Sequence, residues 1–357
     1  MGTVRARRGL RYMAVFHSLL MATALVLGGG GFAPALADLY KPIVIINTYP
    51  PNGPPDIVGR AATHKMLKLM TTFAAPALTD VLAVRAGDAM GLALDRIVKV
   101  DRRAYGRGIP GTRHVVDSRR DGDTLLFGSN LELITQPRLY RLPYVPGRDL
   151  VPVAAVARMP IVMIALAQGG PASVRAFVDA ARAAPGALNY ASSGDFRSGH
   201  LAGDLFVKRA GVSVVHVSYN GGNDALNGVI KGHVPVAFLP LPAVLPALPG
   251  GKIRLLGIAD ASRHVTLPQV PTLSEAGVPG FEAASWFGLY APAGTPGEIV
   301  ARLNEGMVSG LRALKLERLF LAQGLQARYP NAVEHGELMR AEETKWKQVL
   351  DGLNPPY

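Results

Sequence analysis

The chain has 357 residues, a formal net charge of +12 and no cysteine. The missing cysteines exclude a disulfide framework, thiolate catalysis and thiolate metal ligation, and the length favours two compact domains over one. The basic charge favours anionic small molecules as partners, whereas the scatter of most Lys and Arg residues along the chain argues against nucleic acid binding.

The N-terminus is typical of an export signal. Four arginines lie within the first eleven residues, an apolar stretch follows over residues 13–31, and Ala35-Leu36-Ala37 matches the A-x-A cleavage pattern. We therefore expect residues 1–37 to be a cleaved signal peptide and the mature chain to start at Asp38 in the periplasm. A membrane anchor is the alternative, but the apolar stretch is rich in Gly and Ala and short for a span.

The first half of the mature chain predicts strands followed by helices. Apolar runs at residues 42–48, 97–100 and 124–128 predict buried strands. A helix is expected from about Asp56, and residues 102–120 predict a loop with a short helical piece. Between these, residues 74–91 are rich in Ala and Leu without a clear period, so their structure is left open.

The second half continues the alternation. Residues 151–167 are apolar but interrupted at Pro160, which predicts two strands, and Ser173 is expected to cap a helix that ends near Ala184. Further strands are predicted at residues 188–191, 214–217, 234–239 and 253–258. Helices are predicted at residues 200–210 and 224–231, and near the C-terminus with one face formed by Leu338, Glu342, Trp346 and Leu350. Such alternation is the pattern of parallel sheets covered by helices.

One apolar run stands out in the last third of the chain. Residues 286–292 are bounded by turn signals and predict a buried strand. Thr295 as N-cap and Pro296 at the first helical position then predict a helix start. Because this unit comes last, we expect it to be the return crossover into the first domain, with Trp286 and Phe287 packing at the hinge.

Polar residues gather where the predicted strands end. Gly-rich turns before helix N-termini present free backbone N–H groups and a partial positive charge, which bind carboxylates. One such loop alone is ordinary turn chemistry, but four occur, directly after Thr48, Gly128, Ala191 and Val217. Because open α/β sheets bind ligands at the carboxyl ends of their strands, the loops together predict a shared anion-binding cleft.

Catalytic motifs are missing from the mature sequence. It contains no P-loop, H-E-x-x-H or G-x-S-x-G, and we expect no metal or other cofactor. The histidines lie far apart, without metal-ligand spacing, and predict structural roles; they are His64, His114, His200, His216, His233, His264 and His335. A hydrolase would have to use Ser192 or Ser198 with His200, and no partner acid is visible.

Several strings carry a family resemblance. In chain order they are YPPNGPPDIVGR (49–60), DGDTLLFGSN (121–130), LNYASSGDFRSGHLAGDLF (188–206), VHVSYNGGNDAL (215–226), LPQVPTLSEAGVPGFE (267–282) and SWFGLYAPAGTP (285–296). On these strings the chain resembles the Bug family, the extracytoplasmic substrate-binding receptors of tripartite tricarboxylate transporters. The resemblance covers essentially the whole mature chain and is strongest over residues 188–296.

The resemblance implies an α/β periplasmic-binding-protein architecture of the type II, Venus-flytrap kind, with two crossovers between two domains. The implied domains are residues 38–152 with 285–357, and residues 153–284. Such a receptor closes on a small carboxylate and hands it to a membrane transporter or a sensor kinase, without catalysis, and we expect a monomer. The implied ligand-binding residues are Tyr49, Pro51, Asn52, Gly53, Asp56, Ser129, Asn130, Ser192, Ser193, Gly194, Asp195, Ser198, Tyr219, Asn220 and Gly221.

The chain departs from the family where ligand specificity is set. Asn52 stands where the family usually has a glycine, Phe196-Arg197 replace a Gly-Ser pair, and Leu239-Pro240 replace an acidic or amide residue. Arg197 is added to the site because a guanidinium binds a carboxylate through two parallel hydrogen bonds. The alternative is a solvent-facing arginine. An enzyme on the same fold, or a signalling receptor that no longer binds the family's ligands, stays open as a competing interpretation.

Overall fold

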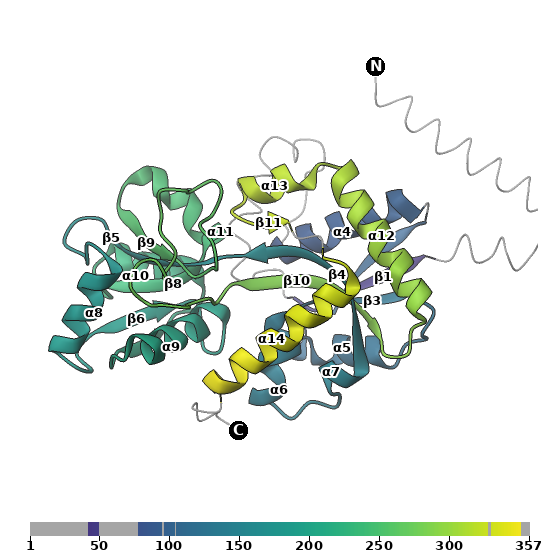
Figure 1. Ribbon diagram of the computed structural model, residues 1–357, viewed down its shortest axis with the longest axis horizontal. Coiled ribbons are helices and arrows are strands. Elements are labelled where there is room, and N and C mark those ends of the chain that lie inside the picture. Colours follow the sequence, from purple (N-terminus) through teal and green to yellow (C-terminus); the bar gives the residue numbers. More distant parts are fainter. Residues whose placement is uncertain (1–41, 50–77, 95, 104, 328–329, 351–357) are drawn as a thin grey trace, which may run out of the picture. The chain divides into compact units, whose positions relative to one another are not determined.

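The computed structural model describes residues 42–49, 78–94, 96–103, 105–327 and 330–350 (Figure 1). The predicted signal peptide, the helix predicted from Asp56 and the C-terminal residues 351–357 lie outside this part. Residues 43–357 form one compact unit. No helix in the described ranges has both the length and the apolar character that crossing a bilayer requires.

The first sheet has six strands in the order β11-β4-β10-β3-β1-β2. Their bounds are β1 Ile43–Asn47, β2 Val98–Arg102, β3 Thr124–Ser129, β4 Leu150–Met159, β10 Ser285–Pro292 and β11 Gln326–Ala327. Strands β2, β1 and β3 are parallel, whereas β10 runs antiparallel to both β3 and β4. This sheet with the helices packed on it is called the first lobe.

Helices cover both faces of the first sheet. On one face α4 (Leu78–Leu94) packs on α12 (Gly297–Ala313), over a core that includes Ile45, Phe127 and Leu289. Contacts to the sheet also come from α5 (Ile109–Val116) and α14 (Ala332–Leu350). The smaller helical segments are η2 Gly106–Gly108, η3 Leu131–Thr135, α6 Gln136–Leu139, α7 Pro146–Asp149 and α13 Leu316–Ala322.

The second sheet has five strands in the order β7-β6-β8-β5-β9. Its elements are β5 Ile161–Leu166, α8 Val174–Ala183, β6 Asn189–Ser192, α9 Ser198–Ala210, β7 Val215–Ser218, α10 Gly222–Ile230, β8 Val236–Pro240, α11 Leu241–Val244, η4 Leu245–Gly250 and β9 Ile253–Ile258. Strands β7, β6 and β8 are parallel, and β5 runs antiparallel to β8 and β9. This sheet with its helices is called the second lobe.

The predicted strands, the two-lobed α/β fold and the break at Pro160 are confirmed, with two corrections. Both sheets are mixed, because β10 and β5 enter antiparallel to their neighbours, so the expectation of parallel sheets was wrong. Helix α12 has Pro296 as its N-cap instead of Thr295, whose hydroxyl donates to the carbonyl of Pro292 at 2.8 Å. The unassigned stretch within residues 74–91 lies largely in α4.

Two chain segments pass between the lobes, from β4 to β5 at Pro160 and from the second lobe into β10 at Ser285. The predicted return of the chain through residues 286–292 is thereby confirmed. Trp286 and Phe287 pack within the first lobe: the Trp286 ring lies 5.3 Å from that of His335, and the Phe287 ring stacks on Phe127 at 5.8 Å.

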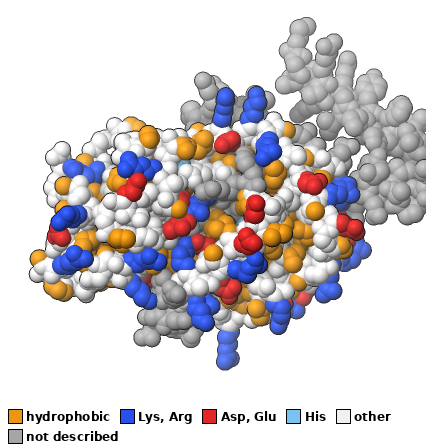
Figure 2. Space-filling view, in the orientation of Figure 1, with side chains coloured by type: hydrophobic (Ala, Val, Ile, Leu, Met, Phe, Trp, Pro, Cys, Tyr) orange, Lys and Arg blue, Asp and Glu red, His pale blue; other side chains and the backbone are white. Residues whose placement is uncertain are grey.

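A buried ion cluster joins the lobes beside the Pro160 crossover. Arg158 on β4 contacts both carboxylate oxygens of Asp260, which follows β9, at 2.8 Å and 2.7 Å. The same guanidinium contacts Glu282, which lies shortly before β10. Elsewhere the charges are dispersed: Figure 2 shows Lys and Arg side chains interspersed with acidic ones over the visible face.

Candidate functional site

The loop between β6 and α9, residues 192–198, is called the β6–α9 loop. It joins the carboxyl end of a parallel strand to the N-terminus of a 13-residue helix, which is the place where open α/β sheets bind ligands. Two of its residues have left-handed backbone conformations, Gly194 with φ +137° and Phe196 with φ +56°. The side chain of Arg197, the N-cap residue of α9, makes no capping hydrogen bond to the helix. A helix start without such a cap leaves backbone N–H groups free to bind an anion or water.

Two polar side chains of this loop are available for a ligand. Ser193 is 2% exposed, and its hydroxyl has no hydrogen-bond partner within the described residues. The guanidinium of Arg197 folds over Gly194, and no acidic side chain described here pairs with it. Partial burial lowers the pKa of Arg197, with no carboxylate acting against it. A partly desolvated cation and an unpartnered buried hydroxyl in one loop are groups suited to hold a carboxylate.

Histidine side chains lie directly beneath the loop. The ring of His200, on α9, stacks on that of His216, on β7, with 3.8 Å between centroids and 9° between planes. The backbone N–H of Phe196 donates to Nδ1 of His200 at 2.8 Å, and Nε2 of His200 lies 3.1 Å from Oδ2 of Asp204. The expectation that the histidines lie far apart was therefore wrong for this pair.

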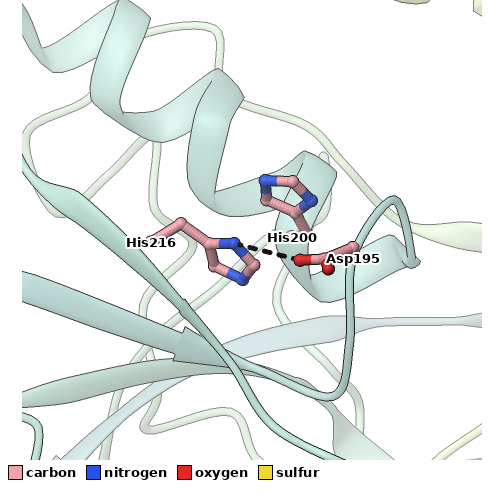
Figure 3. Close-up of side chains that lie close together, drawn as sticks. All are labelled: Asp195, His200 and His216. Carbon is pink, nitrogen blue, oxygen red and sulfur yellow. Dashed lines mark ion pairs between the residues drawn. The ribbon is translucent and has the colours of Figure 1, made fainter. Parts of the chain in front are cut away.

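Asp195, His200 and His216 bring donor atoms within 4.8 Å of one another (Figure 3). Two imidazoles and a carboxylate are ligand types that Zn²⁺ and other transition metals accept. However, Nδ1 of His200 already accepts a hydrogen bond from the N–H of Phe196, and two parallel stacked rings cannot aim their in-plane lone pairs at one ion. The geometry therefore favours a hydrogen-bonded network over a metal centre.

Ser192 pairs with His216, not with His200 as the hydrolase alternative assumed. Its hydroxyl lies 2.8 Å from Nε2 of His216, and Nδ1 of His216 lies 3.7 Å from Asp195. The order serine, histidine, acid resembles a catalytic triad. However, Ser192 is fully buried, and its hydroxyl also donates to the carbonyl of Gly194 at 3.1 Å. These contacts tie the loop to β7.

The loop after β7 joins the same region. The N–H of Tyr219 donates to the carbonyl of Ser192 at 3.1 Å, so this loop lies beside the β6–α9 loop. The Tyr219 ring packs against Gly228 of α10, where a Cβ would overlap it. Asn220 is exposed, and Gly221, with φ +117°, makes the turn into α10. The structure thus brings together all of the predicted site residues of the second lobe from Ser192 to Arg197 and from Tyr219 to Gly221.

In the first lobe, β1 and β3 end around a buried carboxylate that the sequence analysis missed. Glu132 accepts hydrogen bonds from the hydroxyl of Thr48 at 2.9 Å, from the N–H of Ser129 at 3.0 Å and from the hydroxyl of Tyr49. Burial raises the pKa of Glu132 to about 7, and burial together with the nearby carboxylate raises the pKa of Tyr49. The sequence signal for this buried carboxylate is that Glu132 is an acidic residue within the apolar run 131–134.

Asn130 of the first lobe and Ser198 of the second lobe lie at the same cavity. Both line a small cavity of about 10 Å³ with Trp346 and Leu201, and the side-chain amide of Asn130 donates to the carbonyl of Ala284 at 3.3 Å. Larger hollows of about 430 and 410 Å³ lie elsewhere, without the predicted site residues. Four predicted site residues, Pro51, Asn52, Gly53 and Asp56, lie outside the described part of the chain.

Comparisons with known proteins identify similar sequences and structures. Residues 81–354 match the profile of a family described as tripartite tricarboxylate transporter family receptor. Protein BugT of Bordetella pertussis is 31% identical over 88% of this chain and 88% of its own length.

Two solved structures with bound ligands also resemble this chain. Rpa4515 of R. palustris with adipate is 27% identical, with a TM-score of 0.67 over 87% of this chain and 96% of that one. MatC of Rhodopseudomonas palustris with bound malate is 25% identical, with a TM-score of 0.66 over 87% of this chain and 98% of that one.

Proposed function

Because the chain belongs to the tripartite tricarboxylate transporter receptor family, we propose that it captures a small carboxylate and delivers it to the membrane subunits of such a transporter. The family is one of substrate-binding receptors, which implies a periplasmic location and a transporter partner. An N-terminal signal peptide over residues 1–37 and a monomeric receptor complete the proposal. A sensor kinase is the alternative recipient of the ligand signal.

The observation that carries the proposal is the presence of Ser193 and Arg197 in the β6–α9 loop. A buried hydroxyl without a partner in the described residues and a partly desolvated guanidinium without a nearby acid lie in one loop. Both groups gain hydrogen bonds when a carboxylate arrives, and the cation gains its counter-charge. Adipate and malate, which occupy two similar structures, are the first ligands to test.

The binding surface is proposed to lie between the two lobes. Each lobe is taken as one domain, with the chain crossing at Pro160 and before Ser285. Asn130, Ser129 and Tyr49 would face the ligand from the first domain, and the β6–α9 loop with residues 219–221 from the second. Ligand binding would then favour the closed arrangement of a preexisting equilibrium.

A non-catalytic role fits the site better than hydrolysis. Ser192, the serine with a histidine partner, donates its only hydroxyl proton to the carbonyl of Gly194, so this proton does not point to His216. The N–H of Gly194 also donates to the same hydroxyl at 3.3 Å. We therefore propose binding without turnover, which mass analysis of the ligand after incubation would check directly.

The test is titration calorimetry with adipate, malate and a panel of mono-, di- and tricarboxylates. Arg197→Ala should weaken the best ligand at least tenfold, which corresponds to about 1.4 kcal/mol. Arg175→Ala, at an arginine whose side chain is 86% exposed on α8, should leave affinity unchanged. Saturable binding without conversion supports the proposal, whereas chemical conversion of a bound compound would favour an enzyme. Absence of binding to every compound of the panel would favour the signalling interpretation.

A further inference from the structure

The β6–α9 loop holds a strained residue in place through one hydrogen bond. Phe196 has φ +56°, a left-handed conformation that is unfavourable for a residue with a Cβ. Its N–H donates to Nδ1 of His200 at 2.8 Å. Because Phe196 directly precedes Arg197, the conformation of Phe196 sets where the guanidinium and the first turn of α9 lie.

The same hydrogen bond defines the protonation state of His200. A ring nitrogen that accepts from an N–H carries no proton, so Nδ1 is bare and the proton of the neutral ring lies on Nε2. That nitrogen faces Oδ2 of Asp204 at 3.1 Å. The other oxygen of Asp204 accepts from the hydroxyl of Tyr190 at 2.6 Å. The hydrogen bond from Phe196 thus determines the tautomer of the neutral ring.

Charged and titratable groups surround His200 on each neighbouring element. Asp204 on α9 lies 3.1 Å from Nε2 of His200, and the hydroxyl of Tyr190 on β6 donates to Asp204. His216 on β7 stacks on the ring of His200, while Asp195 in the loop lies 3.7 Å from His216. Burial first, and the neighbouring His200 second, lower the pKa of His216 to about 4, so His216 stays neutral where histidines commonly titrate.

We propose that neutral His200 is a positioning residue that holds the β6–α9 loop in its ligand-binding conformation, and that protonation of His200 releases the loop and weakens carboxylate binding. The inference rests on the proposed function for the assumption that this loop holds the carboxylate. A proton on Nδ1 would place one N–H against another, so the bond to Phe196 is replaced by repulsion. Phe196 then leaves the left-handed region, and Arg197 moves with it.

The test uses three variants of the full mature protein. His200→Asn places an amide oxygen near the position of Nδ1 and does not titrate. His200→Leu removes the acceptor, and His233→Asn changes an exposed histidine as the matched control. Adipate is the probe for calorimetry at pH 8 and pH 5.5, a range in which histidine side chains commonly take up protons. Protonation of adipate itself affects all variants alike.

A second measurement, hydrogen exchange, tests the loop in the absence of ligand. Hydrogen exchange at the Phe196 amide, expressed as protection relative to the free peptide rate, reports the bond to His200 directly. Wild-type protein and the His233 variant should lose about tenfold in protection and in adipate affinity between pH 8 and pH 5.5. The His200→Asn variant should keep both within about twofold, and the His200→Leu variant should be about tenfold weaker in both at either pH.

Each outcome separates the two proposals. If the Phe196 amide is equally protected from exchange in wild type and in the His200→Leu variant, the positioning role is overturned, regardless of the adipate affinities. A pH dependence in the His200→Asn variant as large as that of wild type overturns release by protonation. Absence of carboxylate binding in wild type, together with the expected exchange pattern, refutes the proposed function and leaves the role of His200 standing.

Discussion

Substitution of Arg158 by methionine tests whether the ion cluster at the crossover stabilises the fold. The change leaves Asp260, which is 1% exposed, without its hydrogen bond from Nε and its ion contact with Nη2 of Arg158. Among the described residues, Asp260 keeps the hydrogen bond from the N–H of Ala261. Glu282, with 33% of its side chain exposed, stays partly hydrated. Removing one partner of a buried ion pair typically costs about 3–5 kcal/mol. The hydration of Glu282 suggests the lower end, about 3 kcal/mol.

The measurement is urea unfolding at neutral pH, followed by circular dichroism and extrapolated to water. The double variant Arg158→Met with Asp260→Asn removes the stranded charge and should recover more than half of the loss. Arg175→Met, in the exposed pair with Asp179, is the control and should lie within experimental error of wild type. A loss below about 1 kcal/mol for Arg158→Met, or no recovery in the double variant, would refute the reasoning.

Three further predictions concern stability. A Cβ at Gly203 would overlap the Tyr190 ring, so Gly203→Ala should cost about 1–3 kcal/mol in urea unfolding. Burial lowers the pKa of His335 to about 4. As the pH falls from 6.5 to 4, the unfolded chain binds a proton at His335 and the folded protein does not, so the free energy of unfolding should fall by up to about 3 kcal/mol. The His335→Gln variant should lose less stability over the same pH range. Glu132 has the opposite effect on stability, because its pKa is raised in the folded protein. As the pH rises from 4.5 to 7, Glu132 loses its proton more readily in the unfolded chain, and the folded protein becomes less stable. Glu132→Gln should therefore gain up to about 3 kcal/mol relative to wild type from pH 5 to pH 8; parallel pH curves would contradict either assignment.

Most strands were predictable from the sequence because each is a short apolar run between turn residues. The runs at β1, β3 and β9 are examples, and Pro160 marked the break between β4 and β5. Strand direction was not predictable, because β10 lies between β3 and β4 through pairings distant in sequence. The start of α12 was missed by one residue, since both Thr295 and Pro296 suit a helix start, and the hydroxyl of Thr295 donates to the carbonyl of Pro292 instead of capping the helix.

The site was predictable only as a set of loops. Strand-end position and small polar residues located residues 192–198 and 219–221. The stacking of His200 on His216 was not predictable, because it depends on the register in which His216 pairs with Tyr190 across β6 and β7. Glu132 was missed for a related reason. Its partners Thr48 and Ser129 come from two strands that become neighbours only in the folded sheet.

The central position of β10 has a consequence for how the chain acquires its structure. All eight of its residues are buried, and it separates β3 from β4 in the first sheet. The second sheet is continuous in sequence from β5 to β9, so its strands are complete before β10 is synthesised. The second lobe can therefore fold first, whereas β3 and β4 keep unpaired edges until the C-terminal segment arrives. A chain that ends before Ser285 should consequently aggregate through these edges.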